Sequence, residues 1–303
     1  MFEIALRLCR NEETLAGELR IPDANGPRPA LLFVPDILLS RRHGFYPWFC
    51  ERLAQERLVL SLDAGHGGYG ETEGRAQGCL PSFDKQRASE YLLSRELQDL
   101  VHVVRSLARG DLDERAQWDG KHLTLAGHGK GAAIALHLYR RLMVEGYPVS
   151  SVLLLSPPAT LVREGILGDR LRIHVPADPG TDQGDTDVVL GSEFFSDARE
   201  LAEMATLSEL MSSCEAPTLL LCGEEDPVFG INEAERLLRV GHTEKDSLLV
   251  VEMAGHHFGA AHPFEGPTAP LLYAAEQCEH FLSNCEREQS DGPGDASDAH
   301  AIG

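Results

Sequence analysis

Hydrophobic and polar residues alternate in the first part of the chain, over residues 3–8 and 14–21. This alternation predicts two antiparallel strands, with Asn11 and Glu12 as turn residues between them. Farther along, short continuous apolar runs bounded by turn residues are typical of strands that are buried on both faces. These runs cover residues 30–34, 58–62, 123–126, 152–155, 218–222 and 247–251.

A second pattern, in which apolar residues recur every three to four positions, predicts helices between these strands. The predicted helices cover residues 45–56, 89–109, 131–144 and 271–285. Buried strands that alternate with helices indicate the α/β class. We therefore expect an eight-stranded, mostly parallel central sheet flanked by helices, with the first two strands as an antiparallel edge.

The same pattern predicts the domain organisation. Residues 1–285 form one domain, and the alternation is interrupted at about 160–216, which suggests a small lid insertion. The acidic segment 177–187 within this insertion is predicted to be a solvated loop and not a calcium site, because it lacks the terminal glutamate of a calcium-binding EF-hand loop. Residues 286–303 are polar and rich in Gly, Pro and Asp, and are predicted to be a disordered acidic tail.

The amino-acid composition limits the kinds of binding partner and the cellular compartment that we expect. The chain of 303 residues has a formal net charge of −21, which argues against nucleic acid and anionic membranes as partners. Its seven cysteines are odd in number and form no CxxC pair, which favours a reducing compartment. Neither a signal-peptide pattern nor an apolar run long enough to span a bilayer is present, so we expect a cytoplasmic protein without a membrane span.

The most informative segment is residues 122–139, in which a predicted strand runs through Gly127-His128-Gly129-Lys130-Gly131 directly into a helix. This strand, turn and helix resemble the nucleophile elbow, G-x-S-x-G, of α/β hydrolases. Gly127 and Gly131 hold the two flanking glycine positions of that motif. Gly129 stands where the motif has its serine.

Three further segments are similar to the same superfamily. Residues 63–67, followed by Glu71 and Gly74, resemble the D-x-x-G-H-G-x-S-x-G turn of serine-aminopeptidase-like esterases and thioesterases. Residues 216–228 resemble the strand that delivers the acid of the catalytic triad, which implies Asp226 in that role. Residues 253–258 resemble the loop that delivers the triad histidine, which implies His256, with His257 as the alternative.

The resemblance covers nearly the whole chain to about residue 285, and elbow, acid and histidine follow in the order that this superfamily uses. It implies the α/β-hydrolase fold and an esterase-like or thioesterase-like function on a small acyl compound. Serine chemistry is nevertheless doubtful. Glycine has no side chain to form an acyl-enzyme, and loss of a triad nucleophile lowers turnover by roughly six orders of magnitude. Glycine also relaxes the strained elbow, so such a change is compatible with the fold.

A second departure from the family pattern follows the strand at 30–34. By position, Pro35 and Asp36 replace the His-Gly pair that usually helps to build the oxyanion hole. The backbone N–H groups of Lys130 and Ile37 are the donors that remain. We expect the Asp36 carboxylate to oppose negative charge on a substrate oxygen, as a loss independent of the one at Gly129. On this view Gly129→Ser should restore some activity, and Asp36→Gly should raise it further.

Several functions remain open at this stage, and the sequence does not establish whether the chain is an enzyme. A water activated by His256 could give weak hydrolysis, or the chain could be a non-catalytic pseudo-hydrolase that binds a small ligand or a protein partner. A deliberate replacement of the serine is a third alternative, and Asp36 as a new acid or base is a fourth. No cofactor and no metal are expected, because His256, His257 and His262 lack a carboxylate at a suitable spacing. The oligomeric state is not predicted.

Overall fold

The computed structural model describes the whole chain except residues 11–12, 70–82, 163–169, 178–183 and 291–303. The described strands, in chain order, are β1 (Phe2–Arg10), β2 (Glu13–Ile21), β3 (Arg28–Val34), β4 (Leu58–Leu62), β5 (Trp118–His128), β6 (Ser151–Leu155), β7 (Leu171–Val175), β8 (Thr186–Leu190), β9 (Thr218–Gly223) and β10 (Ser247–Val251). The described helices are α1 (Tyr46–Leu53), α2 (Lys85–Ser89), α3 (Leu93–Arg109), α4 (Lys130–Val144), α5 (Ser192–Met204), α6 (Leu207–Ser212), α7 (Ile231–Leu238) and α8 (Ala269–Ser290).

Eight of these strands form one sheet in the order β1-β2-β4-β3-β5-β6-β9-β10. The β1–β2 and β2–β4 pairs are antiparallel, and every other pair is parallel. The prediction of an α/β architecture with an antiparallel edge is therefore confirmed. The strands β7 and β8 form a separate antiparallel hairpin.

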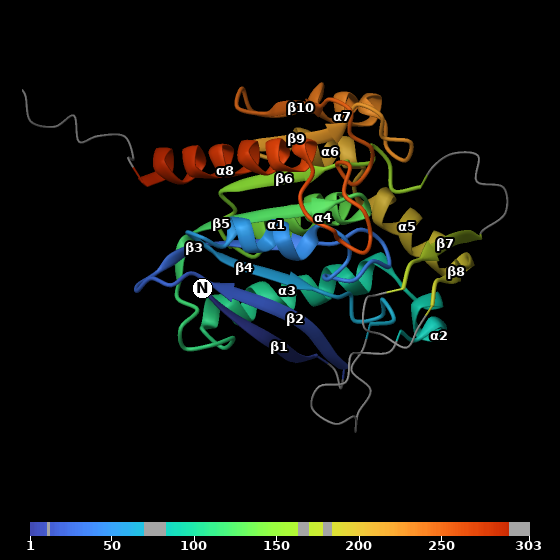
Figure 1. Ribbon diagram of the computed structural model, residues 1–303, viewed down its shortest axis with the longest axis horizontal. Coiled ribbons are helices and arrows are strands. Elements are labelled where there is room, and N and C mark those ends of the chain that lie inside the picture. Colours follow the sequence, from blue (N-terminus) through green and yellow to red (C-terminus); the bar gives the residue numbers. More distant parts are fainter. Residues whose placement is uncertain (11–12, 70–82, 163–169, 178–183, 291–303) are drawn as a thin grey trace, which may run out of the picture.

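The sheet is covered on both faces, as the continuous apolar runs require. In β3, Leu31 and Phe33 pack on the face that carries α1 and α8, whereas Leu32 and Val34 join the larger cluster on the opposite face. Figure 1 shows α1 and α8 in front of the sheet and α3 and α4 behind it. A strand in this environment has no polar face, which is why these segments show no alternation.

Between β6 and β9 the chain forms β7, β8, α5 and α6, in the region where the sequence predicts a lid insertion. Of this group, β7, β8 and α5 lie beyond the carboxyl ends of the parallel strands (Figure 1), whereas α6 packs beside α4 and α7. The acidic loop at 177–187 falls largely outside the described residues. We call the described part of this region, β7 to α6, the cap.

Three details differ from the predicted elements. The helix predicted at 89–109 is α3, which begins at Leu93, and neither the short helix α2 before it nor α7 was predicted. The helix α8 continues to Ser290, so the predicted start of the tail at residue 286 lies inside a helix, while residues 291–303 lie outside the described part. The predicted turn residues Asn11 and Glu12 also lie outside it. Among the described helices, none is long and apolar enough to cross a membrane.

Candidate active site

The turn at Gly129 joins β5 to α4 at the carboxyl end of a central strand, where the sequence places it. Gly129 has φ +55° and ψ −122°. This conformation is strained for any residue that has a side chain, and glycine adopts it readily. The flanking glycines are needed for close packing. A Cβ on Gly127 would collide with the backbone of α4, and one on Gly131 would collide with the backbone of Val34 and Pro35.

Asp226 and His256 lie together at this edge of the sheet. Asp226 follows β9 and His256 follows β10, and Nδ1–H of His256 donates to Asp226 Oδ2 at 2.9 Å. The other carboxylate oxygen of Asp226 accepts from the backbone N–H groups of Val228 and Phe229, at 2.8 and 3.0 Å. The carboxylate is thus fully buried and held in one orientation.

The neighbouring histidine makes no such contact. The Nε2 atom of His257 is buried without a hydrogen-bond partner, and its ring packs 5.1 Å from the ring of His256. Of the two histidines that the sequence leaves open, His256 is therefore the one bonded to Asp226.

The position of Asp36 is the main feature of the site. Its Oδ1 accepts from the backbone N–H of Lys130 at 2.6 Å and from that of Ile37 at 2.8 Å. Its Oδ2 accepts from Nε2–H of His256 at 3.2 Å. These two N–H groups are the pair that the sequence suggests as oxyanion donors, and both donate to one carboxylate oxygen of the chain itself.

Asp36 also occupies the space of the missing side chain. A Cβ built on Gly129 would overlap the carboxyl carbon and both carboxylate oxygens of Asp36. The expectation of two independent losses is therefore wrong: the aspartate fits only because residue 129 is glycine. The same geometry argues against activity in Gly129→Ser alone, because the new side chain would collide with Asp36.

The charges follow from this arrangement. Burial acts to lower the pKa of His256, but its hydrogen bonds to Asp226 and Asp36 outweigh burial and raise that pKa to about 9. Burial likewise acts to raise the pKa of Asp36, but its bond to His256 and its other partners lower that pKa to about 2. At neutral pH the site is an imidazolium between two carboxylates, because both ring nitrogens must donate.

Tyr46 and His128 hold the backbone of Asp36 and of His256 through a chain of hydrogen bonds. The backbone N–H of Asp36 donates to the Tyr46 hydroxyl at 3.3 Å, and that hydroxyl lies 2.8 Å from Nδ1 of His128. Nε2 of His128 lies 2.8 Å from the carbonyl oxygen of His256. Burial holds the pKa of His128 well below its usual value, so its ring is neutral, with Nδ1 accepting and Nε2–H donating. Sequence reasoning missed Tyr46, which carries no signal beyond its place in α1.

Histidines gather around this centre without forming a ready metal site. Among the described residues, nitrogen atoms of His128, His256 and His257 lie within 4.8 Å of one another. Both nitrogens of His128 and of His256 already have protein partners. The third histidine of the predicted set, His262, also has both nitrogens bonded, to Gly44 N–H and to the carbonyl of Ala177.

The segment Asp63-Ala64-Gly65-His66-Gly67 begins at a buried ion pair. Asp63 is buried and pairs with Arg41, which also contacts the buried Glu18. Glu71 and Gly74 lie outside the described residues. This ion pair fixes the loop that follows β3 against the end of β4, and thereby helps to position Asp36.

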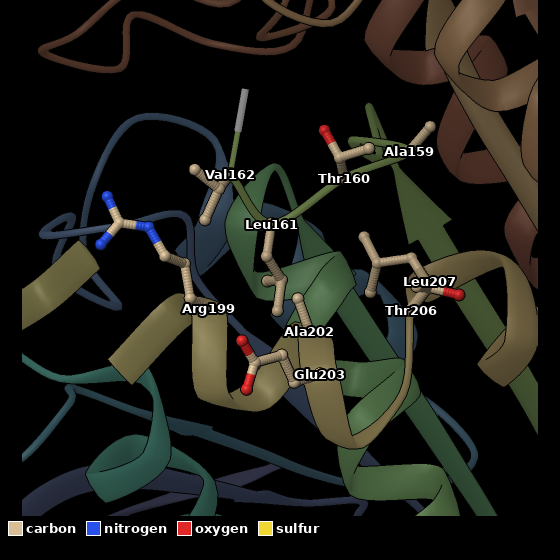
Figure 2. Close-up of a pocket in the computed structure, with 9 residues that line it drawn as sticks. All are labelled: Ala159, Thr160, Leu161, Val162, Arg199, Ala202, Glu203, Thr206 and Leu207. Carbon is tan, nitrogen blue, oxygen red and sulfur yellow. The ribbon is translucent and has the colours of Figure 1, made fainter. Parts of the chain in front are cut away.

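A cavity of about 290 Å³, here called the cap cavity, lies between residues 159–162, which follow β6, and the helices α5 and α6. Figure 2 shows the apolar side chains of Leu161, Ala202 and Leu207 together, with the charged ends of Arg199 and Glu203 to one side. The remaining lining residues are Ala159, Thr160, Val162 and Thr206. Lys130 connects cavity and centre: its backbone N–H binds Asp36, and its Nζ donates to the Leu161 carbonyl at 2.6 Å.

No protein-family model matches the chain, and no curated protein matches it in sequence. Solved structures do match. The esterase domain of a Rhodothermus marinus protein is 16% identical, with a TM-score of 0.61, over 94% of this chain and 99% of that one. Est1E from Butyrivibrio proteoclasticus is 14% identical, with a TM-score of 0.64, over 93% and 99%. A soluble variant of monoglyceride lipase from Saccharomyces cerevisiae is 12% identical, with a TM-score of 0.64, over 94% and 95%. The chain therefore has the α/β-hydrolase fold.

Proposed function

We propose that the chain is an esterase-like protein of the α/β-hydrolase superfamily that binds a small acyl-type compound but does not turn over esters or thioesters through an acyl-enzyme. One observation carries the proposal: the Asp36 carboxylate accepts from both candidate oxyanion donors, the N–H groups of Lys130 and Ile37, and lies where a Cβ on Gly129 would be. Acyl transfer at such an elbow needs a nucleophile there and an empty hole for the substrate oxygen. This chain has neither.

The protonated state of His256 argues against the route through an activated water. A general base must be neutral when it takes a proton from water. Here Nε2 of His256 carries a proton that it donates to Asp36, and the pKa of His256 is raised to about 9. The fit between Asp36 and Gly129 also argues against a lone deliberate replacement of serine, because a serine would not fit beside this aspartate.

The cap cavity supports ligand binding. Ligand pockets are mostly apolar with a few polar groups, and at about 290 Å³ this cavity suits a short chain or a single ring. Leu161, Ala202 and Leu207 would hold the apolar part of the ligand. The described cysteines Cys50, Cys214, Cys222, Cys278 and Cys285 are free thiols, which suits the cytoplasmic location that we propose with this function.

Two measurements test the proposal. A fluorophosphonate probe should not label the wild-type protein, and p-nitrophenyl butyrate should hydrolyse at the background rate. Hexanoate should raise the melting temperature of the wild type, because a ligand that binds only the folded state stabilises it. Ala202→Phe, which fills the cavity, should abolish that rise.

Glu200→Phe places the same ring at an exposed position of α5 and serves as the control, which should keep the rise. Labelling of the wild type, or hydrolysis that disappears in His256→Gln, would show that acyl chemistry survives. An equal response to hexanoate in Ala202→Phe and wild type would refute the cap cavity as the binding site.

A further inference from the structure

The strand β1 lies at one border of the central sheet, and among the described strands it has a neighbour on one side only (Figure 1). An edge strand presents a row of backbone N–H and C=O groups with which another strand can pair. With nine residues, β1 is longer than β10, the five-residue strand at the opposite border. We propose that β1 pairs in antiparallel register with β1 of a second copy of this chain, which joins two copies into a twofold-symmetric dimer. The inference is independent of the proposed function.

The hydrogen bonds of β2 determine which residues of β1 face the open border of the sheet. The carbonyl oxygen of Ala16 in β2 accepts from the N–H of Asp63, just after β4, at 3.0 Å. The backbone groups of Ala16 therefore point toward β4, so Ala16 and its partner Arg7 form a non-hydrogen-bonded pair of the β1–β2 ladder. The backbone groups of Arg7 thus point away from β2, and by alternation so do those of Glu3 and Ala5.

The charges of β1 select one register for the contact. Residues whose backbone groups face the border must stand opposite one another in an antiparallel pair. If Ala5 stands opposite Ala5 of the second copy, then Glu3 stands opposite Arg7 and Arg7 opposite Glu3, and all three side chains are exposed. Opposite charges across a ladder are favourable, and like charges are unfavourable. Registers centred on Glu3 or on Arg7 oppose like charges, and the other registers pair no opposite charges within β1.

The existing contact of Glu3 is compatible with this pairing. Its Oε2 lies 3.3 Å from a guanidinium nitrogen of Arg20 in β2, and its side chain is 55% exposed. A carboxylate has lone pairs for about four hydrogen bonds, so Glu3 can contact Arg20 and Arg7 of the second copy at the same time. Because the same patch then serves both copies, the contact closes on itself and forms a dimer, not a filament.

The other face of β1 extends the hydrophobic core across the same contact. Ile4, Leu6 and Leu8 lie on the face that packs against α3, and Phe2 on this face is 46% exposed. In the proposed register Ile4 stands opposite Leu6, and Phe2 opposite Leu8, in the pairs whose side chains lie closest. The dimer therefore covers apolar surface that one copy leaves exposed. A single strand pair is smaller than the about 800 Å² per partner of a stable interface, so we expect a dissociation constant of about 1–100 µM.

The experiment is sedimentation velocity of the full chain over about 1–500 µM. Salt at about 0.15 M screens the general repulsion between two copies of net charge −21. The wild type should form a dimer. Arg7→Glu opposes two glutamates at each pair, Glu3→Arg opposes two arginines, and each should raise the dissociation constant at least about tenfold. An equimolar mixture of the two variants should recover the dimer, because every pair across the contact then joins opposite charges.

Matched variants separate the contact from general effects of charge. Glu235→Arg and Arg239→Glu make the same changes at exposed positions at the end of α7, which packs on β9 and β10 at the far side of the sheet. They should leave the dimer unchanged, alone and mixed. Ala5→Pro removes an N–H that faces the border and keeps the hydrogen bonds between β1 and β2, so it should abolish the dimer. Circular dichroism shows whether each variant is folded, and recovery in the mixture requires that both charge variants are.

Three results would overturn the inference. A wild type that stays monomeric over the whole range would exclude the dimer. A dimer that Arg7→Glu, Glu3→Arg and Ala5→Pro leave unchanged would place the contact on another surface. Weakening in both charge variants without recovery in their mixture would refute the register. None of these results bears on the hydrolysis of p-nitrophenyl butyrate, so the dimer and the proposed function fail separately.

Discussion

Substituting Gly129 by serine tests directly whether residue 129 and Asp36 share one space. The new Cβ would overlap the Asp36 carboxylate, so either the aspartate or the turn must move. If Asp36 moves, it loses its two backbone donors and its contact with His256. In an Asp36→Gly background the same serine would meet no carboxylate.

Two costs set the size of the effect. Placing a side chain at φ +55° costs on the order of 1–3 kcal/mol in backbone strain. Forcing extra atoms into a packed site costs about 1–3 kcal/mol more. Gly129→Ser should therefore lower the free energy of unfolding by about 2–6 kcal/mol in the wild type. With Asp36→Gly present the collision is absent, so a coupling energy of about 1–3 kcal/mol should remain between the two positions.

The assay is urea unfolding of the four proteins of a double-mutant cycle, followed by tryptophan fluorescence. Gly146→Ser is the matched control, because Gly146 has φ +80° with no atom within 4 Å of an added Cβ. It should show the strain cost and no coupling to Asp36→Gly. Hydrolysis of p-nitrophenyl acetate should appear in the double variant, which combines Gly129→Ser with Asp36→Gly. It should stay at background in Gly129→Ser alone.

Two results would refute the reasoning. Additive free energies, within about 0.5 kcal/mol, would mean that the two positions do not compete for space. A single Gly129→Ser protein as active as the double variant would mean that Asp36 does not fill the oxyanion hole.

Three other perturbations have definite outcomes. The pKa of His256 is 6.5 when unperturbed and about 9 in the folded state. The stabilisation that the charged His256 provides is therefore complete below pH 6.5 and is lost as the pH rises through 9. Urea unfolding should show a loss on the order of 3 kcal/mol over this range in the wild type and a smaller loss in Asp36→Asn. Tyr46→Phe removes the hydroxyl partner of Asp36 N–H and should lower the free energy of unfolding by about 1–3 kcal/mol; an unchanged urea midpoint would contradict the contact. Lys130→Met removes the bond to the Leu161 carbonyl, and hydrogen exchange should speed up in residues 159–162 but not in β9.

The sheet was predictable because its signal is local. Apolar runs such as 30–34 and 58–62 must be buried on both faces, and the structure places them in β3 and β4. The start of α3 was set four residues too early, at 89 instead of Leu93, and the five-residue helix α2 was not predicted. The helix α7 has eight residues, as α1 does, but it was missed because only two of its residues, Ala234 and Leu237, are buried, against four in α1.

The candidate site was predictable residue by residue but not as an arrangement. The motifs that resemble the superfamily placed Gly129, Asp226 and His256 correctly, since each follows a strand whose end is fixed by the sheet. The direction of the Asp36 side chain depends on contacts with residues about 90 and 220 positions away, at Lys130 and His256. The sequence alone places Asp36 near the candidate oxyanion donors, but it does not show that the Asp36 carboxylate accepts hydrogen bonds from them.

The protonation state of His256 tests the central claim most directly. Nitrogen-15 NMR of the imidazole rings at pH 7.5, assigned with His256→Gln, measures whether each ring nitrogen carries a proton. An imidazolium between Asp36 and Asp226 predicts both nitrogens of His256 protonated in the wild type, and a lower pKa for His256 in Asp36→Asn. A neutral His256 in the wild type at pH 7.5, or a titration curve that Asp36→Asn leaves unchanged, would contradict the account.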